Sequence, residues 1–258
     1  MVLQRARIGP LQHHPRYRDG QEDAAWLLHV ASSPVWPDLV IFDCDGVLVD
    51  SERLTVDVEA RVLTELGWPI TTDEVVERFV GRSSASMLAE VARHLGAELT
   101  EQFDAISTIE IRTAFETRLE AVEGIAHLLD AIDAAGVPTC VASSGSHDKM
   151  RATLGITGLW HRFDGRIFSA DEVAHGKPAP DLFVHAAAQM DVDPAGCAVV
   201  EDSPFGVQAA IAAGMTAYGF TGGLAADGAL AAAGAIPFAR MIDLVDLLAA
   251  PRPPRVER

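Results

Sequence analysis

The chain has few cysteines and few lysines for its 258 residues. The three cysteines, at positions 44, 140 and 197, cannot form an even disulfide framework, and each lies in or beside a short apolar run typical of a buried strand. We therefore expect a protein of the reducing cytoplasm. Only Lys149 and Lys177 are lysines, so chemistry that requires an amine has few candidates.

Positive charge is also scarce, because 20 lysines and arginines face 37 acidic residues and the formal net charge is −17. Such a chain repels a nucleic-acid backbone and an anionic membrane surface, so we expect neither as a partner. An anionic substrate would need a local positive site. Residues 203–226 carry no charge, but their five glycines and one proline argue against a membrane span.

The rest of the composition, 49% hydrophobic and 22% charged, is that of an ordinary globular protein with a sizeable core.

Residues 1–36 show no periodicity and predict a flexible extension, and residues 251–258 form a proline-rich tail. The extension contains one apolar stretch, 24–31. That stretch is short and follows two acidic residues, so secretion is the less favoured alternative.

Hydrophobic periodicity divides the remaining residues into an α/β core and a helical insertion. The insertion, 54–121, repeats apolar residues at helical spacing without strand-like alternation. Before and after it, apolar runs alternate with helices, which predicts right-handed crossovers and an open, Rossmann-like parallel sheet built from 37–53 and 122–250. The expected core elements are a helix at 125–135 and strands at 38–42, 137–142, 198–200 and 216–220.

Polar clusters follow three of these strands, at the edge of the sheet where ligands bind in such folds. Asp43 and Asp45 flank one residue after the first strand and would repel each other unless a cation neutralised them. Glu201 and Asp202 follow another strand, and together the four could form an oxygen-rich site that suits magnesium. The alternative is that each cluster caps a helix.

Two further residues are candidates for binding a phosphate. Ser143 ends its strand and opens a turn of small residues, whose hydroxyl and amide groups could hold phosphate oxygens. Lys177 lies in a proline-flanked loop and could supply positive charge. The alternatives are a helix cap for Ser143 and a solvated surface charge for Lys177.

Together these segments resemble the four motifs of the haloacid dehalogenase superfamily, in order. They are residues 42–52 (FDCDGVLVDSE), Ser143, residues 176–181 (GKPAPD) and residues 201–206 (EDSPFG). The resemblance covers about 38–248, and the insertion resembles the four-helix cap of the beta-phosphoglucomutase-like branch. It implies a phosphoric monoester hydrolase.

By this resemblance Asp43 is the nucleophile that forms an aspartyl-phosphate, and Asp45 is the acid and base for the leaving group and water. Ser143 and Lys177 would bind the phosphoryl oxygens. The resemblance also implies that magnesium is held by the Asp43 carboxylate, the Asp45 backbone carbonyl and Asp202, with Glu201 nearby or a direct ligand.

The resemblance also separates the family's activities. Dehalogenases lack the second aspartate, and phosphonate-cleaving relatives need a cap lysine that residues 51–121 do not contain. Mutases of the beta-phosphoglucomutase type also carry a cap lysine, so we favour a phosphatase, with a sugar-phosphate mutase as the alternative. A catalytically idle binding protein is a second alternative, although Asp43, Asp45 and Asp202 are all present.

The substrate implied is a small phosphorylated sugar or sugar acid. In relatives the loop 79–84 faces the active site, so Arg82 and Ser83 are expected to bind the substrate, unless Arg82 is simply an exposed arginine at a helix start. Ser144 and His147, in the turn after Ser143, are the other candidates for substrate binding. We expect a monomer or a weak homodimer.

Overall fold

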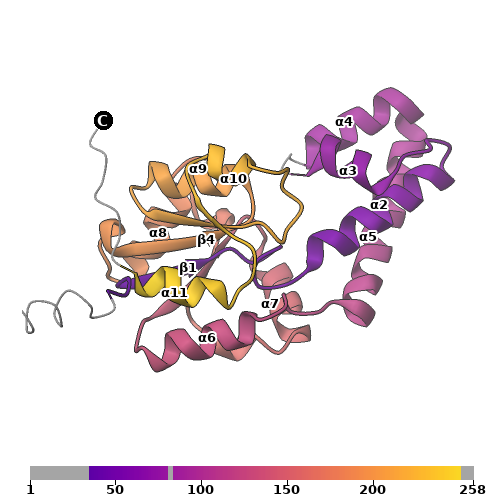
Figure 1. The fold of residues 1–258 in the computed structure, drawn as a ribbon. Coiled ribbons are helices and arrows are strands. Elements are labelled where there is room, and N and C mark those ends of the chain that lie inside the picture. The colour runs from indigo at the N-terminus through magenta and orange to yellow at the C-terminus, as the bar shows by residue number, and fades with distance from the viewer. Residues whose placement is uncertain (1–34, 81–83, 251–258) are drawn as a thin grey trace, which may run out of the picture. The chain divides into compact units, whose positions relative to one another are not determined.

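The computed structural model describes residues 35–80 and 84–250, except for the side chains of residues 84 and 85 (Figure 1). The predicted extension and tail therefore lie almost wholly outside the described residues. Within them, six parallel strands form one sheet in the order β3-β2-β1-β4-β5-β6. The strands are β1 (Leu39–Phe42), β2 (Thr139–Ser143), β3 (Ile167–Ser169), β4 (Cys197–Glu201), β5 (Thr216–Phe220) and β6 (Ile236–Phe238).

The central strand β1 is apolar throughout because both faces of the sheet are covered. Val40 and Phe42 pack toward one face, whereas Leu39 and Ile41 pack toward the other, as the two-residue period of a strand requires. The first face is covered by helices α6 (Ile125–Ala134), α7 (His147–Ile156) and α11 (Asp243–Ala249). The second is covered by α8 (Asp181–Gln189), α9 (Pro204–Ala212) and α10 (Ala229–Ala232).

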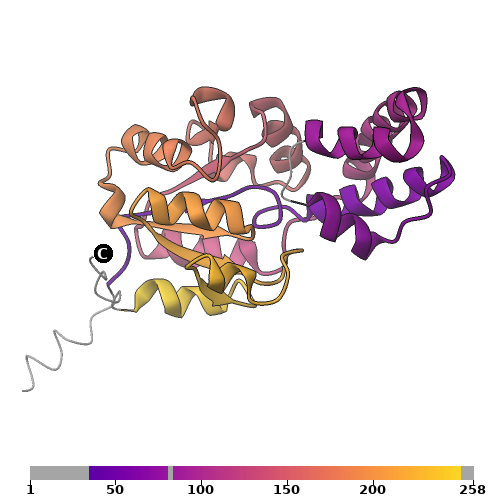
Figure 2. The same cartoon turned by 90° about the horizontal axis from the view of Figure 1, so that it is seen from above.

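Between β1 and α6 the chain forms four helices, which appear in indigo to magenta in Figure 2. They share a hydrophobic core of their own, in which Val56, Val75, Val91 and Phe103 are buried. The four helices are α2 (Ser51–Glu65), α3 (Thr72–Phe79), α4 (Ser84–Leu95) and α5 (Ala97–Arg118). This arrangement confirms the predicted fold class, a parallel-sheet core with an inserted four-helix cap.

Sequence periodicity detected four of the six strands and missed the two at the edges of the sheet. β3 and β6 are three residues long each, too short to show a pattern.

Helix α2 begins at Ser51, directly after the first polar cluster. No helix in the described part of the chain is long and apolar enough to cross a membrane. Short 3-10 helices span Trp160–Arg162, Ala170–Glu172 and Pro194–Gly196.

Because β1 lies at the centre of the sheet, removing one of its buried side chains should lower the free energy of unfolding. Ile41 is fully buried, so Ile41→Ala removes apolar contacts on the α8–α9 face and should lower the free energy of unfolding by about 2–5 kcal/mol. Ile109 on α5 is 56% exposed, and Ile109→Ala should change it by no more than about 0.5 kcal/mol. Urea unfolding of both variants measures the difference, and equal losses would contradict the burial of β1.

Candidate active site

The predicted polar clusters meet at the carboxyl edge of the sheet. Strands β2, β1 and β4 are neighbours in the sheet. β2 ends at Ser143, β4 ends at Glu201, and Asp43 directly follows β1. The helices that follow are capped by other residues, because Ser146 caps α7 and Ser203 caps α9 through their side chains. The helix-cap alternative therefore does not account for Asp43, Ser143 or Asp202.

Lys177 lies at the centre of this edge, in the loop before α8. Its Nζ donates hydrogen bonds of 2.6 Å to Asp43 Oδ1, 2.6 Å to Glu201 Oε1 and 3.3 Å to the backbone carbonyl of Ala142. The side chain is only 6% exposed. Burial favours the neutral amine, but the two carboxylates outweigh it and raise the pKa of Lys177, so the group is an ammonium ion.

Glu201 holds Lys177 with one carboxylate oxygen and the start of α9 with the other. Its Oε2 accepts hydrogen bonds of 2.9 Å from both the backbone N–H and the hydroxyl of Ser203. Gly206 packs so closely on this carboxylate that any Cβ there would overlap it. Both oxygens of Glu201 are thus engaged by the protein, and its predicted role as a direct metal ligand stays a prediction.

The carboxylate of Asp45 is held on both oxygens. Lys149 Nζ lies 2.7 Å from Asp45 Oδ2, and the Ser51 hydroxyl donates to Oδ1. No motif in the sequence marks Lys149, and the rarity of lysine is the one signal that could have found it. Each of the two lysines of the chain contacts one of the paired aspartates. The sequence could not show that α7 turns Lys149 toward Asp45.

Gly46 brings the first motif against Asp202. Its φ of +74° is readily adopted by glycine, and a Cβ at this position would overlap the Asp202 carboxylate. Asp202 and Asp43 are both buried. Burial raises the pKa of Asp43 to about 7 against the opposing effect of Lys177, and burial together with nearby carboxylates raises the pKa of Asp202 well above its usual range.

The site has more negative than positive charge, which is the condition a bound cation would satisfy. Five carboxylates influence one another there, against the two ammonium groups; they belong to Asp43, Asp45, Glu52, Glu201 and Asp202. Among the described residues no three His, Cys, Asp or Glu side chains form a metal cluster. Two of these carboxylates, Asp43 and Asp202, are buried and carry oxygen atoms of the kind that magnesium prefers.

The other predicted site residues differ in where they lie. Ser143 is buried, and its Oγ accepts a hydrogen bond of 3.1 Å from the Gly145 N–H. Ser144 is exposed. His147 Nε2 lies 2.7 Å from Glu172 Oε1, a contact with the segment after β3. Arg82 and Ser83 lie outside the described residues, so their roles stay predictions.

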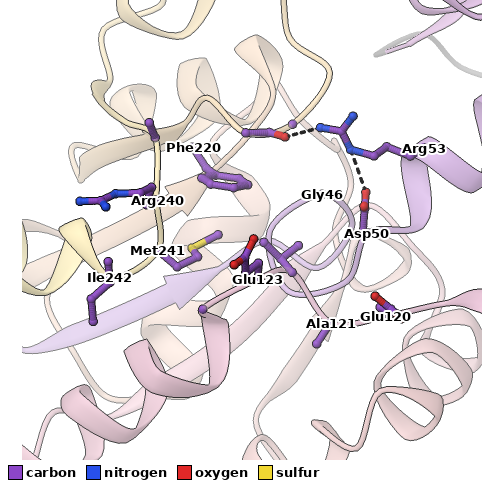
Figure 3. A pocket seen from close by; sticks show the side chains of 15 residues that line it. Gly46, Asp50, Arg53, Glu120, Ala121, Glu123, Phe220, Arg240, Met241 and Ile242 are labelled. Carbon is purple, nitrogen blue, oxygen red and sulfur yellow. Dashed lines mark hydrogen bonds and ion pairs between the residues drawn. The ribbon is translucent and has the colours of Figure 1, made fainter.

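A cavity of about 650 Å³ lies beside the segment that joins β1 to α2 and the segment that joins α5 to α6 (Figure 3). Arg53 closes one side of it, donating 2.6 Å to the Gly222 carbonyl and lying 3.4 Å from Asp50 Oδ1. Of the first motif only Gly46 and Asp50 line this cavity. It is therefore distinct from the Lys177 cluster.

Glu59 on α2 is a carboxylate that the sequence analysis did not select. It is half-buried, and its desolvation raises its pKa to about 7. Its side chain has no hydrogen-bond or ion-pair partner among the residues that the structure describes. No helical-spacing pattern distinguishes such a residue from an exposed glutamate.

This raised pKa has a consequence for stability. The folded protein binds the proton of Glu59 more tightly than the unfolded chain does. Protonated Glu59 therefore favours the folded state, and this contribution is fully present below the usual glutamate pKa and is lost as pH rises through about 7. Glu59→Gln should therefore raise the free energy of unfolding by about 1–3 kcal/mol at pH 8 and much less at pH 5. Urea unfolding at both pH values tests this, with the exposed Glu116→Gln as the control. An equal gain at both pH values would contradict it.

Comparison with known proteins places this constellation in a family. The haloacid dehalogenase-like hydrolase family matches residues 37–214. The 6-phosphogluconate phosphatase of Escherichia coli (strain K12) is 35% identical over 184 residues, which cover 71% of this chain and 82% of the relative.

Two solved structures extend the similarity to the fold. A haloacid dehalogenase-like protein of unknown function from Agrobacterium tumefaciens is 37% identical, with a TM-score of 0.72, covering 82% of this chain and 97% of that one. A beta-phosphoglucomutase-like protein from Thermotoga maritima is 29% identical, with a TM-score of 0.69, covering 81% and 97%. With its four motifs at one edge of the sheet and a helical insertion after the first, the chain belongs to the haloacid dehalogenase-like hydrolase family.

Proposed function

We propose that this hydrolase is a magnesium-dependent phosphatase that releases phosphate from a small phosphorylated sugar or sugar acid through an aspartyl-phosphate intermediate. One observation carries the proposal: Lys177 Nζ lies 2.6 Å from Asp43 Oδ1. A nucleophile and a buried positive charge for the transferring phosphoryl group thus lie side by side. The similarity to a phosphatase of sugar-acid phosphate supports the same reaction class.

In the first step a carboxylate oxygen of Asp43 attacks phosphorus, and the bond from phosphorus to the leaving oxygen breaks. Asp45 gives that oxygen a proton, so the alcohol leaves neutral. Lys177 and Ser143 stabilise the charge on the non-bridging oxygens. Hydrogen bonds from Lys149 and Ser51 hold the Asp45 carboxylate in place.

In the second step water attacks the phosphorus of the aspartyl-phosphate and gives a proton to Asp45. The bond between phosphorus and the Asp43 oxygen breaks, which releases inorganic phosphate and restores the carboxylate. Asp45 thus returns to the protonated state it needs for the next turnover. Nothing beyond water and the substrate is consumed.

Magnesium fits the same residues. The Asp43 and Asp202 carboxylates and the Asp45 backbone carbonyl would hold it, and Gly46 seats the first motif directly against Asp202. When bound, the ion supplies positive charge to the phosphoryl oxygens. The excess of buried carboxylates over lysines supports this role.

The nucleophile is tested by Asp43→Asn, which keeps the shape of the side chain but removes its charge. We expect the turnover number to fall by at least about a thousandfold, with an unchanged circular dichroism spectrum. Asp148→Asn, an exposed change on α7, is the matched control and should retain activity. Phosphate release assayed on a panel of sugar and sugar-acid phosphates gives the comparison. Comparable activity in the Asp43 variant would refute the covalent mechanism.

The metal requirement is tested by chelation. Dialysis against EDTA should reduce phosphate release to background, because the buried carboxylates are left without a compensating cation. Adding magnesium should restore activity, whereas adding sodium to the same ionic strength should not. Full activity in the chelated protein would contradict a role for a divalent ion. The same assay, with isomeric products measured in parallel, separates a phosphatase from a mutase.

A further inference from the structure

A small cavity of about 190 Å³ opens beside the carboxylate of Asp45. Asp45 and Lys149 form one side, and one face of α2 forms another through Glu52, Thr55 and Glu59. These three positions lie three and four residues apart, so the helix presents them on the same side. The proposed acid for the leaving group thus faces a cavity that α2 lines with oxygen atoms.

The carboxylates in this cavity differ in whether the protein satisfies them. Asp45 accepts hydrogen bonds from Lys149 and Ser51. Glu52 and Glu59 are half-buried and accept none from any residue that the structure describes. Partial burial disfavours the charged form of a carboxylate that has no partner, and it raises the pKa of both groups to about 7, with neighbouring carboxylates adding to the effect at Glu52.

The volume of the cavity limits what can enter it. At roughly 30 Å³ per water molecule it holds the equivalent of about six waters, well below the roughly 300–1,000 Å³ of sites for drug-sized ligands. A short hydroxylated chain fits this volume. Phe79, Val80 and Met87 supply an apolar wall against which its carbon atoms can pack.

We propose that this cavity receives the leaving group of the substrate, and that Glu59 selects leaving groups rich in hydroxyl groups over those that end in a carboxylate. The inference rests on the proposed phosphatase function and changes its substrate class, because it disfavours esters of sugar acids and favours esters of sugars and polyols. Above about pH 7, where Glu52 and Glu59 are ionised, a hydroxyl donates a hydrogen bond to Glu59, whereas a carboxylate of the leaving group would be repelled.

Glu59 is a specificity residue in this account, because it would contact the substrate away from the reacting bonds. The repulsion of a carboxylate and the loss of a hydrogen bond both act on the ratio of two substrates. Neither affects an ester whose leaving group has no hydroxyl or carboxylate. These two consequences distinguish selection from a merely structural role.

The experiment compares esters that differ only in one terminal group. Glycerol phosphate and phosphoglycerate form one pair, glucitol phosphate and phosphogluconate form another, and ethyl phosphate reports the chemistry alone. At pH 8 we expect the wild-type protein to prefer the polyol member of each pair by about tenfold or more in kcat/KM. Glu59→Gln should reduce that preference at least about threefold and leave kcat on ethyl phosphate within about twofold.

The control is Glu116→Gln on α5, an exposed glutamate that should leave every ratio unchanged. A wild-type preference for the acid members, or an unchanged ratio in the Glu59 variant, would overturn the selection by Glu59 while phosphate release still upheld the phosphatase. If the wild-type protein releases phosphate from none of the esters, ethyl phosphate included, both the phosphatase function and the selection by Glu59 are refuted. The two failures are therefore distinguishable.

Discussion

Lys177 lies between Asp43 and Glu201 and joins the ends of three neighbouring strands, because it also contacts the carbonyl of Ala142 at the end of β2. Without its ammonium group two buried carboxylates would face each other unpaired, at a cost of about 3–5 kcal/mol. The same contacts place positive charge where a phosphoryl group would be transferred. One buried interaction thus organises both the edge of the sheet and its proposed chemistry.

The distribution of charge around this interaction explains why the site is costly to the folded protein. Carboxylates outnumber lysines, and burial raises the pKa of Asp43 and of Glu59 to about 7. Catalytic sites commonly retain such unfavourable groups because ligands compensate them during function. Here a divalent ion would compensate the carboxylates nearest phosphorus, and hydroxyl groups of the leaving group would compensate Glu59.

The sequence predicted those parts of the structure that depend on local pattern and on one topological rule. β1 is a continuous apolar run, and polar residues that follow parallel strands meet at one edge, so Asp43, Ser143 and Glu201 could be grouped in advance. The pairing of Lys149 with Asp45 joins residues 104 positions apart and depends on how α7 is oriented. The contact of His147 with Glu172 and the burial of Glu59 likewise arise from packing, which periodicity does not encode.

The covalent pathway through Asp43 is the central claim, and the stereochemistry of phosphoryl transfer tests it most directly. The measurement follows a phosphate monoester made chiral at phosphorus by oxygen isotopes, with transfer from the enzyme to an alcohol acceptor. Two successive in-line displacements, first by Asp43 and then by the acceptor, each invert phosphorus, so we predict net retention of configuration. Net inversion would mean a single direct displacement and would contradict an aspartyl-phosphate intermediate.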